Sequence, residues 1–208
     1  NRERDLVGIY LSAHPLDEYQ IILENVCNVK MVDLADLTPL QNRDLVMGGI
    51  VTGVREGYTK TGKPYGIAKL EDYSGSFEFA FFGNEWVEKK NFFMEGMFLY
   101  LKGKCQPKQW RQNEFEVKVN TIELLPDVKE EVIEQLTISA PLSEINDEFI
   151  AEFSSLVKAH PGKVTLNFYV KDDEGQHISL TSKNMKINVQ KDIIAYLKEQ
   201  TMLSYKIN

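Results

Sequence analysis

Cationic and aromatic residues gather in and around two short polar stretches of the chain, a combination typical of single-strand nucleic-acid binding. The first stretch, "TKTGKP" at residues 59–64, places two lysines between two segments of alternating apolar residues. The second, "PKQWRQN" at residues 107–113, holds a tryptophan between two cations. Cations neutralise phosphates, and an aromatic ring gives an unstacked base a surface to stack on. The candidate binding residues are Arg55, Lys60, Lys63, Tyr65, Lys69, Lys108, Trp110 and Arg111.

The elements that position these residues follow from a change of apolar period at Leu45. Alternation of apolar and polar residues predicts strands at residues 45–58, 65–72, 77–82, 97–106 and 114–125. Between the third and fourth strands, Asn84 is a plausible N-cap and Gly96 a stop for one short helix. Five strands with a helix at this point predict an OB-fold barrel. A generic small β-barrel or an SH3-like module remains the alternative.

An OB barrel usually binds nucleic acid on the outer face of strands two and three, between the loops that join strands 1–2 and 4–5. Alternation places Tyr65 and Lys69 on that face, and Phe77, Phe79 and Phe81 in the interior. Glu78 and Ala80 share the outer face, where a strong stacking platform would have aromatics, so we expect weak, loop-carried and salt-sensitive binding. In the competing interpretation the loops are only solvated, Trp110 covers a barrel edge, and the barrel binds protein.

The flanking regions have different patterns and suggest three parts in all. Residues 1–44 read as a short helical segment plus linker, and residues 45–126 as the OB-fold domain. Residues 127–208 predict a small α+β domain of the order strand, helix, two or three strands, helix. Its first helix has an apolar face formed by Phe149, Ile150, Phe153, Leu156 and Val157. The expected fold class is therefore mixed β and α+β.

Charge and composition limit the possible functions. The net charge of −7 argues against a bulk nucleic-acid binder, although residues 45–120 hold 11 Lys and Arg against 9 Asp and Glu. Two distant cysteines and three scattered histidines have no metal-ligand spacing, so we expect reduced thiols, a cytoplasmic protein and no cofactor or metal. No nucleophile is paired with a base and no nucleotide-binding loop is present, which leaves an independent hydrolase without support. The pairs Glu71–Asp72 and Asp172–Asp173 are expected to be structural.

Two segments resemble a known family. The stretch "LVGIYLSAHPLDEY" at residues 6–19 is similar to the segment that precedes the OB domain in bacterial replicative DNA polymerase III alpha subunits. The stretch "GGIVTGVREGYTKTGKPYGIAKLEDYSGSFEFAFF" at residues 48–82 is similar to the start of that OB domain. Thr61 stands where many relatives have a second consecutive basic residue, which lowers the affinity expected of this loop.

The resemblance implies a noncatalytic C-terminal fragment of a polymerase. The family's catalytic aspartates lie upstream and have no counterpart here, and its OB domain binds single-stranded template at basic positions that correspond to Arg55, Lys60 and Lys63. The family's C-terminal domain engages the tau subunit of the clamp loader in some members, and the holoenzyme includes a sliding clamp. Residues 135–138, "QLTI", faintly resemble a clamp-binding peptide inside a predicted strand. The competing hypothesis is a pure protein-interaction module with no direct DNA binding.

Overall fold

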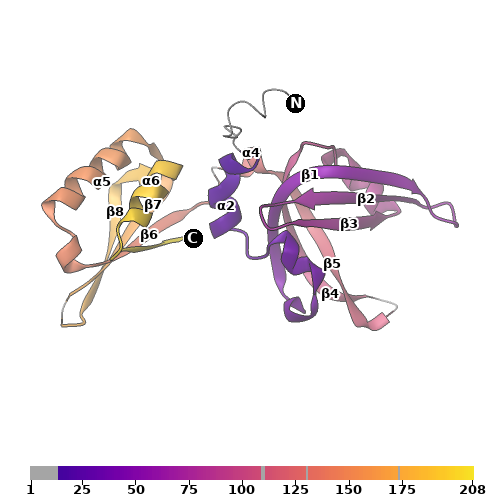
Figure 1. The fold of residues 1–208 in the computed structure, drawn as a ribbon, viewed down its shortest axis with the longest axis horizontal. Helices are drawn as coiled ribbons and strands as arrows, with labels where there is room; N and C mark the ends of the chain where they lie inside the picture. The colour runs from indigo at the N-terminus through magenta and orange to yellow at the C-terminus, as the bar shows by residue number, and fades with distance from the viewer. Residues whose placement is uncertain (1–13, 109–110, 130, 173) are drawn as a thin grey trace, which may run out of the picture. The chain divides into compact units, whose positions relative to one another are not determined.

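The structure is a computed structural model that describes residues 14–108, 111–129, 131–172 and 174–208 (Figure 1). The segment 6–13 of the first family-like stretch therefore lies outside the described residues. The chain separates into two compact units, of which the first ends at Asp127 and the second is Val128–Asn208. Each unit has its own sheet and its own core.

The first unit is built on a five-stranded antiparallel sheet with the strand order β3-β2-β1-β4-β5. Its strands are β1 (Asp44–Tyr58), β2 (Pro64–Glu71), β3 (Ser76–Phe82), β4 (Phe98–Lys108) and β5 (Arg111–Leu124). The first half of β1 pairs with β4 and the second half with β2, and a register shift between Val51 and Gly53 separates the two ladders. The five strands confirm the expected OB-fold order, while no ladder joins β3 to β5 among the described residues.

Short helical segments surround this sheet. The helices of the first unit are α2 (Gln20–Asn25), α3 (Asn84–Lys89) and α4 (Leu125–Val128), with 3₁₀ turns at Asp17–Tyr19, Met31–Ala35, Thr38–Leu40 and Lys90–Phe92. The expectation of Asn84 as an N-cap is wrong, because Asn84 is the first helical residue and Gly83 precedes it at φ +60°. A side chain at φ +60° is disfavoured, which explains why a glycine turns the chain into α3.

The core of the first unit contains the interior faces predicted from alternation. Phe79, Phe81, Ala68 and Leu70 are all buried, and Phe77 packs against them while partly exposed. The core also takes in the segment before β1, from which Val29, Met31, Leu34 and Leu40 are buried.

Asp72 holds that preceding segment in place. Its carboxylate accepts the Met31 N–H at 2.9 Å and the Ser74 N–H at 2.7 Å, and Ser74 Oγ accepts the Val32 N–H at 3.1 Å. The structural role expected for Asp72 is therefore the one the contacts give it, since it joins the β2–β3 turn to the 3₁₀ turn at Met31–Ala35.

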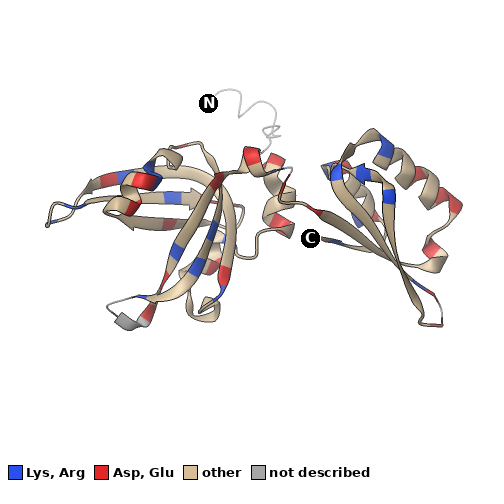
Figure 2. Cartoon of the chain, turned by 180° about the vertical axis from the view of Figure 1, so that it is seen from behind, with Lys and Arg blue, Asp and Glu red and all other residues tan. Residues whose placement is uncertain are grey.

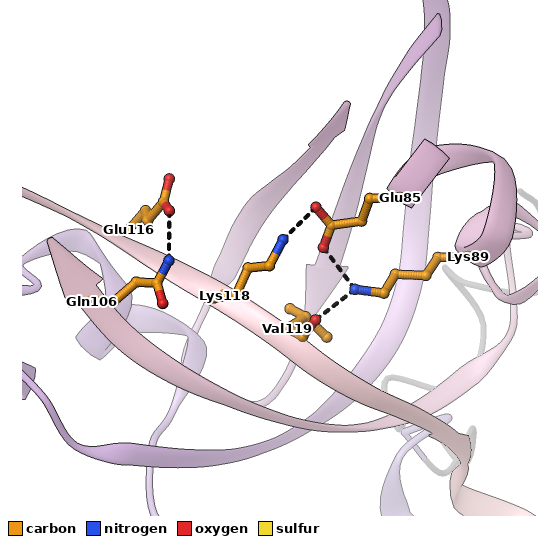
Figure 3. Close-up of polar contacts among 6 residues, drawn as sticks. All are labelled: Glu85, Lys89, Gln106, Glu116, Lys118 and Val119. Carbon is orange, nitrogen blue, oxygen red and sulfur yellow. Dashed lines mark hydrogen bonds and ion pairs between the residues drawn. The ribbon is translucent and has the colours of Figure 1, made fainter. Parts of the chain in front are cut away.

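Helix α3 is tied to β5 by a small charged network (Figure 3). Glu85 forms ion pairs with Lys89 at 2.7 Å and with Lys118 of β5 at 2.6 Å, and Lys89 also donates to the Val119 carbonyl. Val119 adjoins the position where the β4–β5 register shifts. Burial would raise the pKa of Glu85, but the hydrogen bonds and charges of Lys118 and Lys89 outweigh it and lower the pKa below its usual value.

We expect Glu85→Gln to lower the free energy of unfolding by about 1 kcal/mol at neutral pH. Because the carboxyl has a lower pKa in the folded than in the unfolded chain, its stabilisation is present above about pH 4.3 and is lost as the pH falls through the folded pKa. Urea unfolding at several pH values should show the two proteins converging in acid. Glu88→Gln, at an exposed carboxylate of the same helix, is the control, and an equal loss there would contradict a role for the network.

The second unit is a four-stranded sheet of order β8-β7-β6-β9, in which β6 and β7 are parallel and the other pairs antiparallel. Its elements are β6 (Gln135–Pro141), a 3₁₀ turn (Leu142–Glu144), α5 (Asp147–Ala159), β7 (Pro161–Lys171), β8 (His177–Ile187), α6 (Lys191–Glu199) and β9 (Ser204–Ile207). The α+β class is confirmed. Strand β9 was not predicted, and β8 is one strand where the sequence suggested two.

The core of this unit lies between the sheet and its helices. Phe149, Phe153 and Val157 of α5 are buried as expected, and Phe153 meets Phe168 edge-on with ring centroids 6.0 Å apart. The prediction was wrong for Ile150, which is 48% exposed. Residues 135–138 belong to the inner strand β6, where Leu136 and Ile138 are fully buried, so they are not presented as a docking peptide.

Candidate nucleic-acid interface

The outer face of β1, β2 and β3 follows directly from the strand registers. Three cross-strand rows lie on it, and the first row is nearest the β1–β2 loop. The rows are Gly57–Tyr65–Phe82, Arg55–Ile67–Ala80 and Gly53–Lys69–Glu78. The face thus combines an aromatic end next to the loop with two cations and one carboxylate farther along.

The aromatic end contains a residue that the sequence analysis missed. The rings of Tyr65 and Phe82 have centroids 6.2 Å apart and are tilted by 36°. Phe82 is 57% exposed, so its ring is open to solvent. The signal was present in the alternation, because Phe82 continues the outward series of Glu78 and Ala80. Two neighbouring aromatic rings can each stack a base, at about 1–3 kcal/mol per base.

The β1–β2 loop is a compact turn that holds its two lysines outward. The Thr59 N–H donates to the Lys63 carbonyl at 2.8 Å, and the Lys63 N–H donates to Thr59 Oγ1 at 3.0 Å. Gly62 has φ +76°, a conformation that glycine adopts without strain. Lys60 and Lys63 are exposed, and neither has an ion-pair partner in the described part of the chain. Figure 2 shows basic residues at this hairpin tip and mixed charges over the rest of the sheet.

Arg55 has a partner on the same face. Its Nη2 lies 2.8 and 2.7 Å from the two carboxylate oxygens of Glu78 on β3. Both side chains remain open to water, with 66% and 51% of their surface exposed. The third cation of this region, Lys69, lies directly opposite Glu78 in the β2–β3 register. Sequence reasoning placed these residues on one surface but gave no account of the pairing.

The second predicted loop is shorter than expected. Strand β4 runs to Lys108 and β5 begins at Arg111, and these two residues are paired in the β4–β5 ladder. The prediction of a loop over residues 107–113 was therefore wrong, because most of that stretch is strand. Lys108 Nζ is 2.7 Å from Glu114 Oε2, so this cation is also neutralised. Trp110 lies outside the described residues.

Other chemistry has little support in the described residues. No group of three or more His, Cys, Asp or Glu side chains could hold a metal ion, and no helix is long and apolar enough to cross a membrane. Burial, with a smaller contribution from the charge of Asp72, raises the pKa of the Cys27 thiol to about 12, and burial also raises that of Cys105. Both thiols therefore stay protonated at neutral pH and are poor nucleophiles.

Two family models match separate parts of the chain. Residues 45–125 match the family described as OB-fold nucleic acid binding domain. Residues 136–208 match the family described as DNA polymerase III alpha subunit, C-terminal domain.

Curated relatives extend over most of the chain. The DNA polymerase III subunit alpha of Bacillus subtilis is 25% identical over 95% of this chain and 17% of its own length. The subunit of Haemophilus influenzae is 25% identical over 92% of this chain and 16% of its own length. Among solved structures, the second OB-fold domain of replication protein A from Methanococcus maripaludis is 16% identical, covers 43% of this chain and 92% of that one, and has a TM-score of 0.27, too low to bear on function.

These matches confirm the resemblance seen in the sequence. The chain is similar to the C-terminal region of DNA polymerase III alpha subunits, with an OB-fold region followed by the family's C-terminal domain. It spans 15–17% of the length of the first three curated relatives.

Proposed function

We propose that the chain is a noncatalytic module of a cytoplasmic replicative DNA polymerase of the polymerase III alpha type. In this proposal the OB domain, residues 45–126, guides single-stranded template DNA. The C-terminal domain, residues 127–208, assembles with the tau subunit of the clamp loader. Nucleotidyl transfer belongs to other parts of the polymerase, and this chain contributes binding and positioning.

The observation that carries the DNA-binding proposal is the junction of a free cationic loop with an aromatic pair. Lys60 and Lys63 point into solvent from the β1–β2 turn, and Tyr65 and Phe82 form the next row of the sheet. A single strand whose phosphates lie at the loop can place its unstacked bases on these rings. Single-strand binders combine charge along the backbone with aromatic stacking in this way. Lys69, Arg55, Lys108, Trp110 and Arg111 remain proposed contacts farther along the path.

The proposal for the second unit is supported by the family match and by an exposed apolar edge. Ile178 and Leu180 of the edge strand β8 are 63% and 53% exposed. They pair with Val170 and Phe168 of β7 and share the sheet face of the buried Leu166. Clustered apolar residues left uncovered on a sheet edge are typical of protein-binding surfaces. A sliding-clamp contact, in turn, does not use residues 135–138, because these are buried in β6.

A salt titration tests the DNA-binding proposal. We expect labelled single-stranded DNA to bind the full chain with an affinity that falls by about tenfold or more between 50 mM and 200 mM salt, because phosphate contacts release counterions. Fluorescence anisotropy measures the binding, and duplex of equal length should bind more weakly. A salt-independent affinity, or equal binding of duplex, would argue against a template guide.

The second candidate function is a protein-interaction module that binds no DNA. It is favoured by the neutralisation of Arg55 and Lys108 by Glu78 and Glu114, and by the net charge of −7. This function predicts no binding of either DNA at the lower salt concentration. It also predicts capture of purified tau subunit by the full chain, weakened by Leu180→Asp.

A further inference from the structure

One carboxylate lies between the two cations of the proposed DNA-binding face. Glu78 bonds Arg55 through Nη2 at 2.8 and 2.7 Å and lies opposite Lys69 in the β2–β3 register. On the nine outer positions of the three rows, Glu78 is the one acidic side chain and Arg55 and Lys69 are the two basic ones. The charge that would attract a phosphate to this part of the face is therefore partly cancelled by a single residue.

The position of this ion pair matters because it follows the aromatic row. Arg55 is two residues before Gly57 on β1, which places it about 7 Å along the strand from the row of Tyr65 and Phe82. A DNA strand that leaves the aromatic row along the sheet thus meets Arg55 and Glu78 next. A phosphate at this point gains the guanidinium only if the carboxylate gives it up, since a phosphate and a carboxylate repel each other.

The exchange is energetically feasible. An ion pair between exposed side chains contributes about 0–1 kcal/mol, and Arg55 and Glu78 are both more than half exposed. The pair therefore does not close the face, but it lowers the affinity of any strand that reaches Arg55. We infer that Glu78 is an affinity-limiting residue that competes with DNA phosphates for Arg55. This inference rests on the proposed binding of single strands.

Neutralising Glu78 tests the inference directly. We expect Glu78→Gln in the full chain to tighten binding of a labelled oligothymidylate of about 16 nucleotides by about three- to tenfold at 50 mM salt. The freed arginine should also steepen the slope of log K against log salt by about 0.7, the value of one added phosphate contact on a single strand. Fluorescence anisotropy at several salt concentrations gives both quantities.

Glu56→Gln is the matched control, since it removes the same charge from the neighbouring residue of Arg55. Glu56 is exposed, alternates to the opposite face of β1 and has no ion-pair partner in the described part of the chain. We expect it to change the affinity by less than about twofold, because screening weakens a charge that does not line the face.

Arg55→Gln completes a double-mutant cycle. If Glu78 acts through Arg55, most of the gain from Glu78→Gln disappears in the Arg55→Gln background. A gain of the same size in both backgrounds, or an equal gain from Glu56→Gln, overturns the inference and leaves the proposed function standing. If neither the native chain nor Glu78→Gln binds the oligonucleotide, the proposed function fails and the inference with it. Binding by Glu78→Gln alone supports both.

Discussion

Replacing Gly66 with alanine is expected to destabilise the first unit by about 3 kcal/mol, at the upper end of the usual range for overpacking. Gly66 is buried in β2, and a Cβ at this position would overlap the six-membered ring of Trp86 on α3. The indole has little room to move, because it stacks on Phe93 at 6.1 Å and on Phe81 at 6.5 Å. Urea unfolding followed by circular dichroism, with the transitions of the two units fitted separately, measures the loss.

Two further variants separate the indole clash from a general glycine effect. At Gly53 of the neighbouring strand, the nearest atom to an added Cβ is 4.0 Å away, so Gly53→Ala should change the free energy of unfolding by less than about 0.5 kcal/mol. In a Trp86→Leu background, Gly66→Ala should become nearly neutral, because the two positions are in contact and their effects are not additive. An unchanged penalty in that background would exclude the indole as its cause.

The strands of the first unit could be predicted because their residues alternate. Phe77, Phe79 and Phe81 have one parity and the polar residues between them the other, so the period alone gives both the strand and its buried face. The contact of Gly66 with Trp86 could not be predicted in this way. It depends on how far α3 tilts toward β2, and that tilt is set by packing in three dimensions. Strand β9 escaped prediction for a related reason, since four residues are too few to show a period.

The candidate site was predictable residue by residue but not as a set of pairs. Arg55, Lys60, Lys63, Tyr65 and Lys69 were identified from type and spacing. Which of them are neutralised depends on the strand register, which brings Glu78 of β3 within reach of Arg55 of β1 across the intervening strand. Register is fixed by turn geometry and by the match of buried faces, and neither is visible in a local stretch of sequence.

Reversing both loop charges, Lys60→Glu with Lys63→Glu, is expected to weaken single-strand binding by about 30-fold at 50 mM salt. These lysines have no carboxylate partner among the described residues, so their charge is available to phosphates in full. Two lost contacts should also make the salt dependence shallower by about 1.4 in the slope of log K against log salt. Anisotropy titrations of the double variant and the native chain measure both effects.

A matched reversal in the second unit distinguishes local contact from net charge. Lys183 and Lys186 of β8 are exposed, and Lys183→Glu with Lys186→Glu changes the total charge by the same amount. That variant should bind within about twofold of the native chain, because charges beyond a Debye length of the bound strand are largely screened. Equal losses in the two double variants would mean that overall charge governs binding. Since Lys60 and Lys63 adjoin the aromatic row and Lys183 and Lys186 belong to another sheet, an unequal loss assigns the phosphate contacts to the β1–β2 loop.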